Sequence, residues 1–375
     1  MHQPHPAVRP FRIETPESAL AELHARLRRT RWADELPGGG WDYGVPLDEL
    51  KELVGYWLDG YEWRAWEERL NGYPQFLTTV DGQDLHFLHV RSAEPDAMPL
   101  LLTHGWPGSV ADFLDVVAPL TDPRGHGAAG APAFDLVIAS LPGFGFSGPT
   151  RQPGWDVGRI AGAFDELMRR LGYSRYGIGG NDAGAQVAVE VARRHPESLI
   201  GVHVTQIWSM PRGDDGELDG LSEADQAALD IRNWFTENFG AYHDLHSQQP
   251  QTLAHALADS PAGLLAWYLQ IYRDEVDRDF ILTDVTTAWL TETAASSIRL
   301  YYENRHAAQP PTGPTRVPLA LAQFTDDFIS MRRFAERDHA GIVSWNSYDR
   351  PGHFAARQSP DLLVGDLRQF FGTLG

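Results

Sequence analysis

The stretch of the sequence best suited to chemistry is Gly-Gly-Asn-Asp-Ala-Gly at residues 179–184. Small residues two positions before and two positions after a central side chain are typical of a sharp strand-to-helix turn that presents a nucleophile. Gly180 and Gly184 fit this turn, because larger side chains would collide there. The pattern predicts that Asp182 is a carboxylate nucleophile. An aspartate that caps a helix N-terminus is the alternative, and these six residues alone leave it open.

Two further glycine-containing segments favour the nucleophile. Residues 100–110, LLLTHGWPGSV, run from a strand pattern into a glycine-rich turn. In a strand-turn-helix site of this kind, such a turn supplies one backbone N–H to an oxyanion, and the residue after the nucleophile supplies another. We therefore expect the N–H groups of Trp106 and Ala183 to form an oxyanion hole beside Asp182.

A histidine and a second acid should complete the set in the chain order nucleophile, acid, histidine. Of the 15 histidines, His353 alone lies between the last predicted strand and the last predicted helix. The acid should follow the strand pattern VPLALAQF at 317–324, where Asp326 and Asp327 are adjacent. The residues themselves do not decide between these two aspartates.

A metal site is the competing interpretation of His243 and His246, which have the i, i+3 spacing of a helical zinc pair. A third ligand of matching spacing is missing from the sequence, and so is an HExxH motif. We therefore interpret this pair as one polar helix face and predict neither a metal nor an organic cofactor.

The elements that must position these residues follow an alternating pattern. Strand patterns begin at residue 75 and alternate with helix patterns up to residue 205, which predicts a parallel sheet. Residues 207 to about 310 show helix patterns only, and strand patterns return at 317–324 and 342–348. Helix patterns also cover 14–35 and 46–70, the second interrupted at Gly60. The fold class is α/β: a doubly wound, mostly parallel sheet with a helical cap insertion and an N-terminal helical extension.

This order of elements predicts four regions along the chain. They are an N-terminal helical region (1–75), the first part of an α/β core (76–206), a helical cap (207–310) and the second part of the core (311–375).

Composition limits the partners. The 375 residues carry a formal net charge of −20, which argues against nucleic acid and anionic membranes as partners. The absence of cysteine excludes disulfides and thiol catalysis. The N-terminus lacks the apolar core of a signal peptide, and the chain lacks an apolar run of about 18 residues, so we expect a cytoplasmic protein. The oligomeric state stays open, with a homodimer as one option.

Several segments in a fixed order resemble the microsomal-type epoxide hydrolases of the α/β-hydrolase superfamily, including their soluble bacterial members. Residues 25–76 resemble the N-terminal region of that family. The other matching segments are HGWPGS, LPGFGFSG, ADSPAGLLAW, SSIRLYYEN and GHFAA. The likeness runs nearly end to end, so it implies the α/β-hydrolase fold.

The resemblance also implies roles for single residues. The family's nucleophile falls on Asp182 and its histidine on His353. Its acid lies three positions after a phenylalanine, which here selects Asp327 over Asp326. One departure is Ala183, where the family often has tryptophan, although its backbone N–H remains available.

Two tyrosines of the cap bind the epoxide oxygen in that family. The resemblance places them at Tyr242, before LHSQQPQTLAHALADSP, and at Tyr301 of RLYYEN rather than Tyr302.

The function that the resemblance implies is conversion of an epoxide to a vicinal diol through a covalent ester on Asp182. A haloalkane or haloacid dehalogenase could use the same aspartate, but the N-terminal region and the two tyrosines count against it. A hydrolase-fold protein that binds a small molecule without turnover is a third alternative. A serine esterase is excluded because residue 182 is not serine. Detoxification and secondary metabolism both stay open as the biological role.

Overall fold

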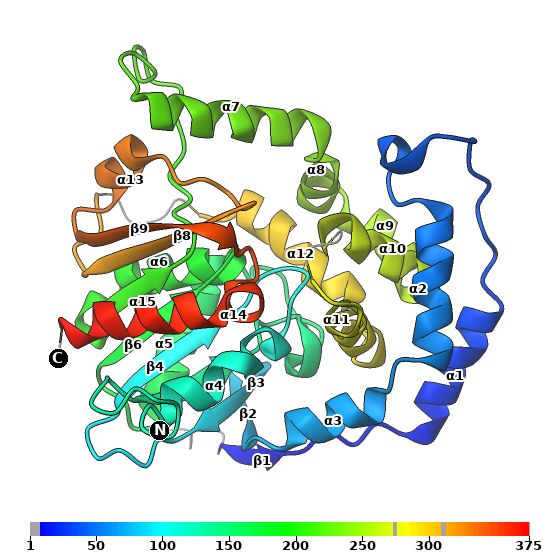
Figure 1. The fold of residues 1–375 in the computed structure, drawn as a ribbon, viewed down its shortest axis with the longest axis horizontal. Coiled ribbons are helices and arrows are strands. Elements are labelled where there is room, and N and C mark those ends of the chain that lie inside the picture. The colour runs from blue at the N-terminus through cyan, green and yellow to red at the C-terminus, as the bar shows by residue number, and fades with distance from the viewer. Residues whose placement is uncertain (1–7, 273–275, 309–312, 375) are drawn as a thin grey trace.

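A single sheet runs through the computed structural model, which describes residues 8–272, 276–308 and 313–374. Its strands are β1 (Arg9–Phe11), β2 (Gln75–Val80), β3 (Gln83–Val90), β4 (Met98–Thr103), β5 (Phe134–Ala139), β6 (Tyr176–Gly180), β7 (Leu199–Val204), β8 (Leu319–Thr325) and β9 (Ile342–Pro351). In the described residues these nine strands have the order β1-β2-β3-β5-β4-β6-β7-β8-β9 (Figure 1). The pairs from β1 to β5 are antiparallel and those from β5 to β9 are parallel, as the sequence predicts for most of the sheet.

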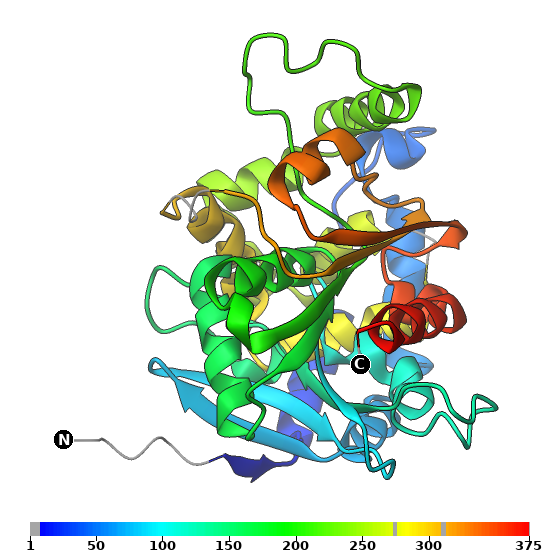
Figure 2. The ribbon, with the colours of Figure 1, turned by 90° about the vertical axis from the view of Figure 1, so that its left-hand side faces the viewer.

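Helices cover both faces of the parallel part. Helix α5 (Val157–Arg170) packs against α6 (Ala183–Arg194) on one face, and α4 (Leu114–Thr121) contacts α15 (Pro360–Gly372) on the other (Figure 2). Strands covered on both faces need continuous apolar runs, and Leu100–Leu102 and Leu136–Ala139 are such runs, fully or almost fully buried. The doubly wound sheet is therefore confirmed.

A set of helices separates β7 from β8. They are α7 (Glu223–Asn238), α8 (Ala241–Gln248), α9 (Pro250–Asp259), α10 (Pro261–Tyr272), α11 (Arg278–Leu290) and α12 (Ala294–Arg305). The described residues of this insertion contain no strand, so the predicted helical insertion is confirmed.

The N-terminal helices pack against this insertion. Helices α1 (Glu17–Arg28) and α2 (Leu47–Asp59) contact α10, and α3 (Trp63–Asn71) contacts α11 (Figure 1). The Tyr56 hydroxyl donates a hydrogen bond of 2.7 Å to Asp279 of α11. The division into four regions at residues 75, 206 and 310 stays a prediction. Residues 1–7, 273–275, 309–312 and 375 of those regions lie outside the described ones.

The structure differs from the predicted elements at the N-terminus. The helix expected over 14–35 is shorter, since α1 ends at Arg28. Strand β1 was not predicted: it has three residues, one of them Pro10, and pairs with β2 at the sheet edge. Three residues are too few for a periodic pattern. Proline is tolerated in an edge strand because, at that position, the sheet does not need a hydrogen bond from its backbone nitrogen.

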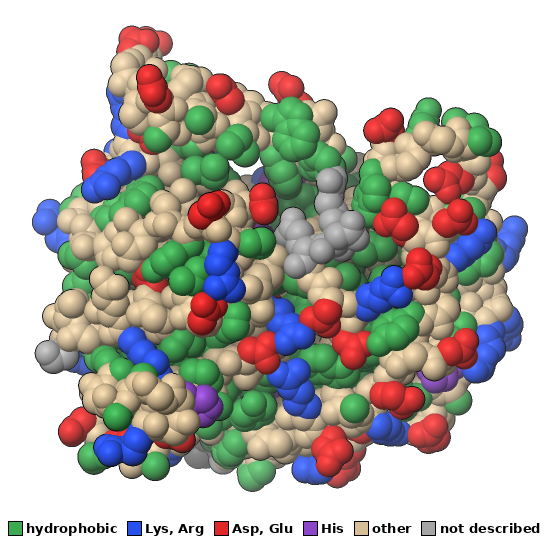
Figure 3. Space-filling view, in the orientation of Figure 1, with side chains coloured by type: hydrophobic (Ala, Val, Ile, Leu, Met, Phe, Trp, Pro, Cys, Tyr) green, Lys and Arg blue, Asp and Glu red, His purple; other side chains and the backbone are tan. Residues whose placement is uncertain are grey.

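The surface charge is mixed on the face shown in Figure 3. Among the described residues there, arginine and acidic side chains alternate and the basic side chains do not gather into one patch. Every helix in the described residues is too short or too polar to cross a bilayer.

Candidate active site

The turn at Asp182 is the sharpest feature of the site. Strand β6 ends at Gly180, α6 begins at Ala183, and Asp182 between them has φ +49° and ψ −124°. A non-glycine residue with positive φ is uncommon and marks a strained, functional turn when its surroundings hold it. In the described structure the Asp182 side chain makes no capping hydrogen bond to α6, which argues against the helix-cap interpretation.

Close approach of two loops explains the glycines around Asp182. A Cβ atom on Gly180 would lie 2.6 Å from the carbonyl oxygen of Thr103, and one on Gly184 would lie 2.2 Å from the same oxygen. A Cβ atom on Gly105 would lie 2.1 Å from Asp182 Oδ1. These distances are shorter than van der Waals contact, so each glycine lets the turn approach the end of β4.

The loop after β4 holds one oxygen of Asp182. The backbone N–H of Trp106 donates a 2.9 Å hydrogen bond to Asp182 Oδ1. His104 fixes this loop, since its Nε2 accepts from the N–H of Leu141 at 3.2 Å and its Nδ1 lies 2.8 Å from the carbonyl oxygen of Gly105. Burial lowers the pKa of His104 to about 4, so the ring is neutral and Nδ1 is the donor. Ala183 begins α6, where backbone N–H groups lack helical partners.

His353 and Asp327 form a partly buried pair. His353 lies between β9 and the short helix α14 (Ala355–Gln358), and its Nδ1 is 2.7 Å from Asp327 Oδ1. The Asp327 side chain is only 2% exposed and also accepts the N–H of Phe328 at 2.7 Å. Because a carboxylate only accepts, Nδ1 carries the proton and Nε2 is the basic nitrogen of the neutral ring. Asp326 is exposed, so the structure brings Asp327 rather than Asp326 to the histidine.

Asn181, which precedes the nucleophile, has a structural role. Its side-chain amide donates a 3.0 Å hydrogen bond to the carbonyl oxygen of His353. This contact ties the loop of the histidine to the turn that carries Asp182.

The two predicted tyrosines lie on different helices and meet over Trp106. Tyr242 of α8 stacks on the Trp106 ring with centroids 5.5 Å apart, and Tyr301 of α12 is edge-on to it at 6.1 Å. The two phenol rings are 6.2 Å apart. Burial raises the pKa of both phenols above the ordinary value, and the charge of Asp182 raises both further. Both hydroxyls therefore stay protonated, as hydrogen-bond donors, at neutral pH.

The structure gives no support to a metal at His243 and His246. The indole N–H of Trp267 donates to His246 Nε2 at 2.9 Å, and burial lowers the pKa of His246 to about 3. Its ring packs against Tyr301, with centroids 4.9 Å apart. Among the residues that the structure describes, no group of three or more ionisable side chains could hold a metal ion.

Gln206 contacts both Asp182 and Asp327, although the sequence analysis did not single it out. Its side-chain carbonyl accepts the backbone N–H of Asp182, and its amide nitrogen donates to both Asp327 oxygens at 2.8 and 2.6 Å. No sequence pattern identifies a glutamine two residues after a strand as part of an active site.

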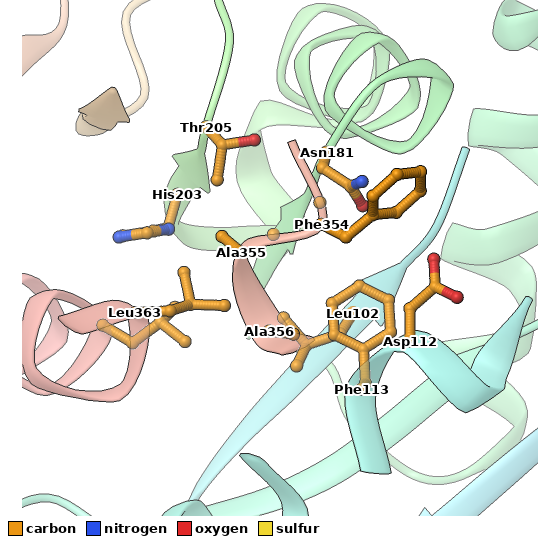
Figure 4. A pocket seen from close by; sticks show the side chains of 13 residues that line it. Leu102, Asp112, Phe113, Asn181, His203, Thr205, Phe354, Ala355, Ala356 and Leu363 are labelled. Carbon is orange, nitrogen blue, oxygen red and sulfur yellow. The ribbon is translucent and has the colours of Figure 1, made fainter. Parts of the chain in front are cut away.

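A small cavity lies behind the turn (Figure 4). Its volume of about 20 Å³ has room for roughly one water molecule. Its lining is mainly apolar and includes Phe113, Asn181, Phe354, Ala355 and Leu363, but none of the predicted catalytic or oxyanion-hole residues. We interpret it as a packing defect between α14 and the sheet.

Comparison with known proteins places the chain in a family. Residues 8–113 match the family model described as epoxide hydrolase N terminus, and residues 98–278 match the alpha/beta hydrolase fold. The sequence is 40% identical to a Stigmatella aurantiaca protein whose name assigns it provisionally to the epoxide hydrolases, over 98% of this chain and 85% of that protein. It is 30% identical to epoxide hydrolase 1 of Sus scrofa, over 98% of this chain and 89% of the relative. The chain belongs to the epoxide hydrolase family.

Solved structures agree with this family membership. Epoxide hydrolase from Aspergillus niger superposes with a TM-score of 0.86 at 28% identity, covering 98% of this chain and 97% of the other. Juvenile hormone epoxide hydrolase from Bombyx mori superposes with a TM-score of 0.89 at 26% identity, covering 98% and 95%. The α/β-hydrolase fold and the family resemblance are thus confirmed.

Proposed function

We propose that this epoxide hydrolase family member converts its substrate to a vicinal diol in two steps, through a covalent ester on Asp182. The observation that carries the proposal is the environment of that carboxylate. Trp106 N–H holds Oδ1, and two partly buried phenols lie beside the Trp106 ring. An anionic nucleophile needs no base to attack a strained sp³ carbon, so aspartate suits this reaction where serine would not.

In the first step Asp182 opens the epoxide. With Oδ1 held by Trp106, the other oxygen, Oδ2, attacks a ring carbon and the carbon–oxygen bond of the epoxide breaks. Negative charge then develops on the epoxide oxygen. Tyr242 and Tyr301 donate hydrogen bonds that strengthen as this charge grows, so they stabilise the transition state more than the bound substrate.

In the second step water hydrolyses the ester. His353 Nε2 accepts a proton from water, which attacks the Asp182 carboxyl carbon, while Asp327 stabilises the imidazolium that forms. The N–H groups of Trp106 and Ala183 stabilise the oxyanion on Oδ1. The ester bond to Oδ2 breaks as the His353 imidazolium returns its proton to that oxygen, and the other proton of the water neutralises the epoxide-derived alkoxide. The diol leaves with Oδ2, and Asp182 retains the oxygen of the water as a carboxylate. Neither step requires a metal or an organic cofactor.

The substrate class is tested by incubating the purified protein with styrene oxide and, separately, with a chloroalkane. We expect diol from the first and no halide from the second, with Asp182→Asn as the inactive control for both. Halide release without diol would instead show a dehalogenase. Binding of styrene oxide without either product would show a protein that binds but does not turn over its ligand.

We further propose the four regions given above as the domain organisation, with residues 207–310 as a cap that carries both tyrosines. A cytoplasmic location and a homodimer stay predictions.

A further inference from the structure

Gln206 lies at the centre of the site but has no part in the chemistry described above. It follows β7 by two residues at the carboxyl edge of the sheet and is completely buried. A buried amide is costly unless its donors and acceptor are satisfied, so its partners define its role.

The partners of Gln206 allow only one orientation of the amide. The backbone N–H of Asp182 can only donate, so it must face the side-chain carbonyl Oε1. The Asp327 carboxylate can only accept, and both of its oxygens lie within hydrogen-bond distance of Nε2. One rigid amide therefore connects the backbone of the nucleophile with the side chain of the acid.

The same contacts determine how Asp327 meets the histidine. Nε2 of Gln206 lies 3.4 Å from His353 Nδ1, and both atoms carry protons that point to Asp327. With Phe328 N–H as a third donor, the carboxylate is held in one rotation about its Cβ–Cγ bond. This rotation keeps Oδ1 at 2.7 Å from Nδ1.

We propose that Gln206 is a positioning residue for the hydrolytic step: it fixes Asp327 in the orientation that lets His353 act as a base. This inference rests on the two-step function proposed above. Hydrolysis of the ester depends on the His353–Asp327 pair, whereas attack by Asp182 on the epoxide does not. Loss of the amide should therefore slow the second step far more than the first.

Gln206→Met removes the hydrogen bonds to Asp182 and to both Asp327 oxygens and keeps the side-chain length. We expect ester hydrolysis to slow by about 10- to 100-fold, the usual effect of losing an outer partner of a functional side chain. Ester formation should stay within about threefold of the unmodified enzyme, and ester should accumulate at steady state. Rapid mixing with an epoxide, followed by quenching and mass measurement, separates the two rates.

Ser330→Ala is the matched control. Ser330 is buried, and its Oγ accepts the N–H of Ile207, the residue next to Gln206, at 2.8 Å. The change removes one buried hydrogen bond from the same segment and leaves the partners of Asp327 intact. We expect both rates to stay close to those of the unmodified enzyme.

Gln206→Glu provides a second test that does not depend on loss of function. As a neutral acid, the new side chain can accept from Asp182 N–H and donate to Asp327, whereas its ionised form repels that carboxylate. The rate of ester hydrolysis in Gln206→Glu, divided by the rate in Gln206→Met, should rise as the pH falls from about 8 to about 5. In this range a glutamic acid that lies against another carboxylate becomes protonated.

Three results would overturn the inference. They are equal slowing of both steps in Gln206→Met, unchanged hydrolysis in that variant, and a ratio between the Glu and Met variants that does not change with pH. In each of these results an ester still forms, so the two-step function survives. Failure of the unmodified enzyme and of Gln206→Met to form any ester would instead overturn the proposed function and this inference with it.

Discussion

The His353→Gln enzyme is expected to take up one equivalent of epoxide and then stop. Histidine is assigned only to the hydrolytic step, because Asp182 is already anionic when it attacks. The Nδ1 of His353 is bound to Asp327, which leaves Nε2 as the base. Glutamine keeps a polar side chain at this position but cannot accept a proton at neutral pH. Hydrolysis should therefore slow by about 10³-fold or more, within the range for loss of a general base.

Intact-protein mass spectrometry checks this expectation. After addition of epoxide, the His353→Gln protein should gain the full mass of one substrate molecule, and fragmentation should place that mass on Asp182. Asp182→Asn combined with His353→Gln is the control and should gain no mass. Full turnover by His353→Gln, or a protein that stays unmodified although it binds substrate, would contradict the assignment of the histidine.

Ester formation should depend on the two phenols together. Tyr242→Phe and Tyr301→Phe remove one donor each, and we expect each to slow ester formation by about 10²-fold. The double variant should lose about 10⁴-fold or more, because the developing alkoxide then has neither donor. Burial keeps both phenols protonated, so the effect should not vary between about pH 6 and pH 9.

Stopped-flow tryptophan fluorescence measures this step, since the stacking of Tyr242 on Trp106 puts a reporter at the site. Tyr302→Phe is the matched control. This neighbour of Tyr301 is 39% exposed, and the family resemblance did not select it. If Tyr302→Phe slows ester formation and Tyr301→Phe does not, the tyrosine assignment is wrong.

The fold could be predicted where the sequence carries periodic information. Strands β4, β5 and β7 are rich in apolar residues, and the structure ends β7 at Val204, one residue before the predicted end of the alternating pattern at 205. The turn at Asp182 was predicted for a steric reason that the structure explains: Gly180 and Gly184 approach the Thr103 carbonyl too closely for any side chain. Strand β1 was missed because its three residues are too few for a periodic pattern.

The site itself could be predicted only in part. Topological position was enough to single out His353, but Asp326 and Asp327 both follow β8, and the sequence alone could not separate them. The difference arises from the backbone, since Asp326 takes a positive φ of 60° and points to solvent while Asp327 turns inward. Gln206 could not be predicted, because its role comes only from contacts with residues 24 and 121 positions away.

The origin of the oxygen in the diol tests the central claim most directly, because the covalent route makes Asp182 the source of that oxygen. With enzyme in excess over styrene oxide, one turnover in ¹⁸O-water should give a diol that is almost free of label. The peptide that contains Asp182 should gain about one heavy oxygen, since water attacks the carboxyl carbon and its oxygen stays there. Direct attack of water on the epoxide gives the opposite distribution. Label in the first-turnover diol, with none in the Asp182 peptide, would contradict the covalent mechanism.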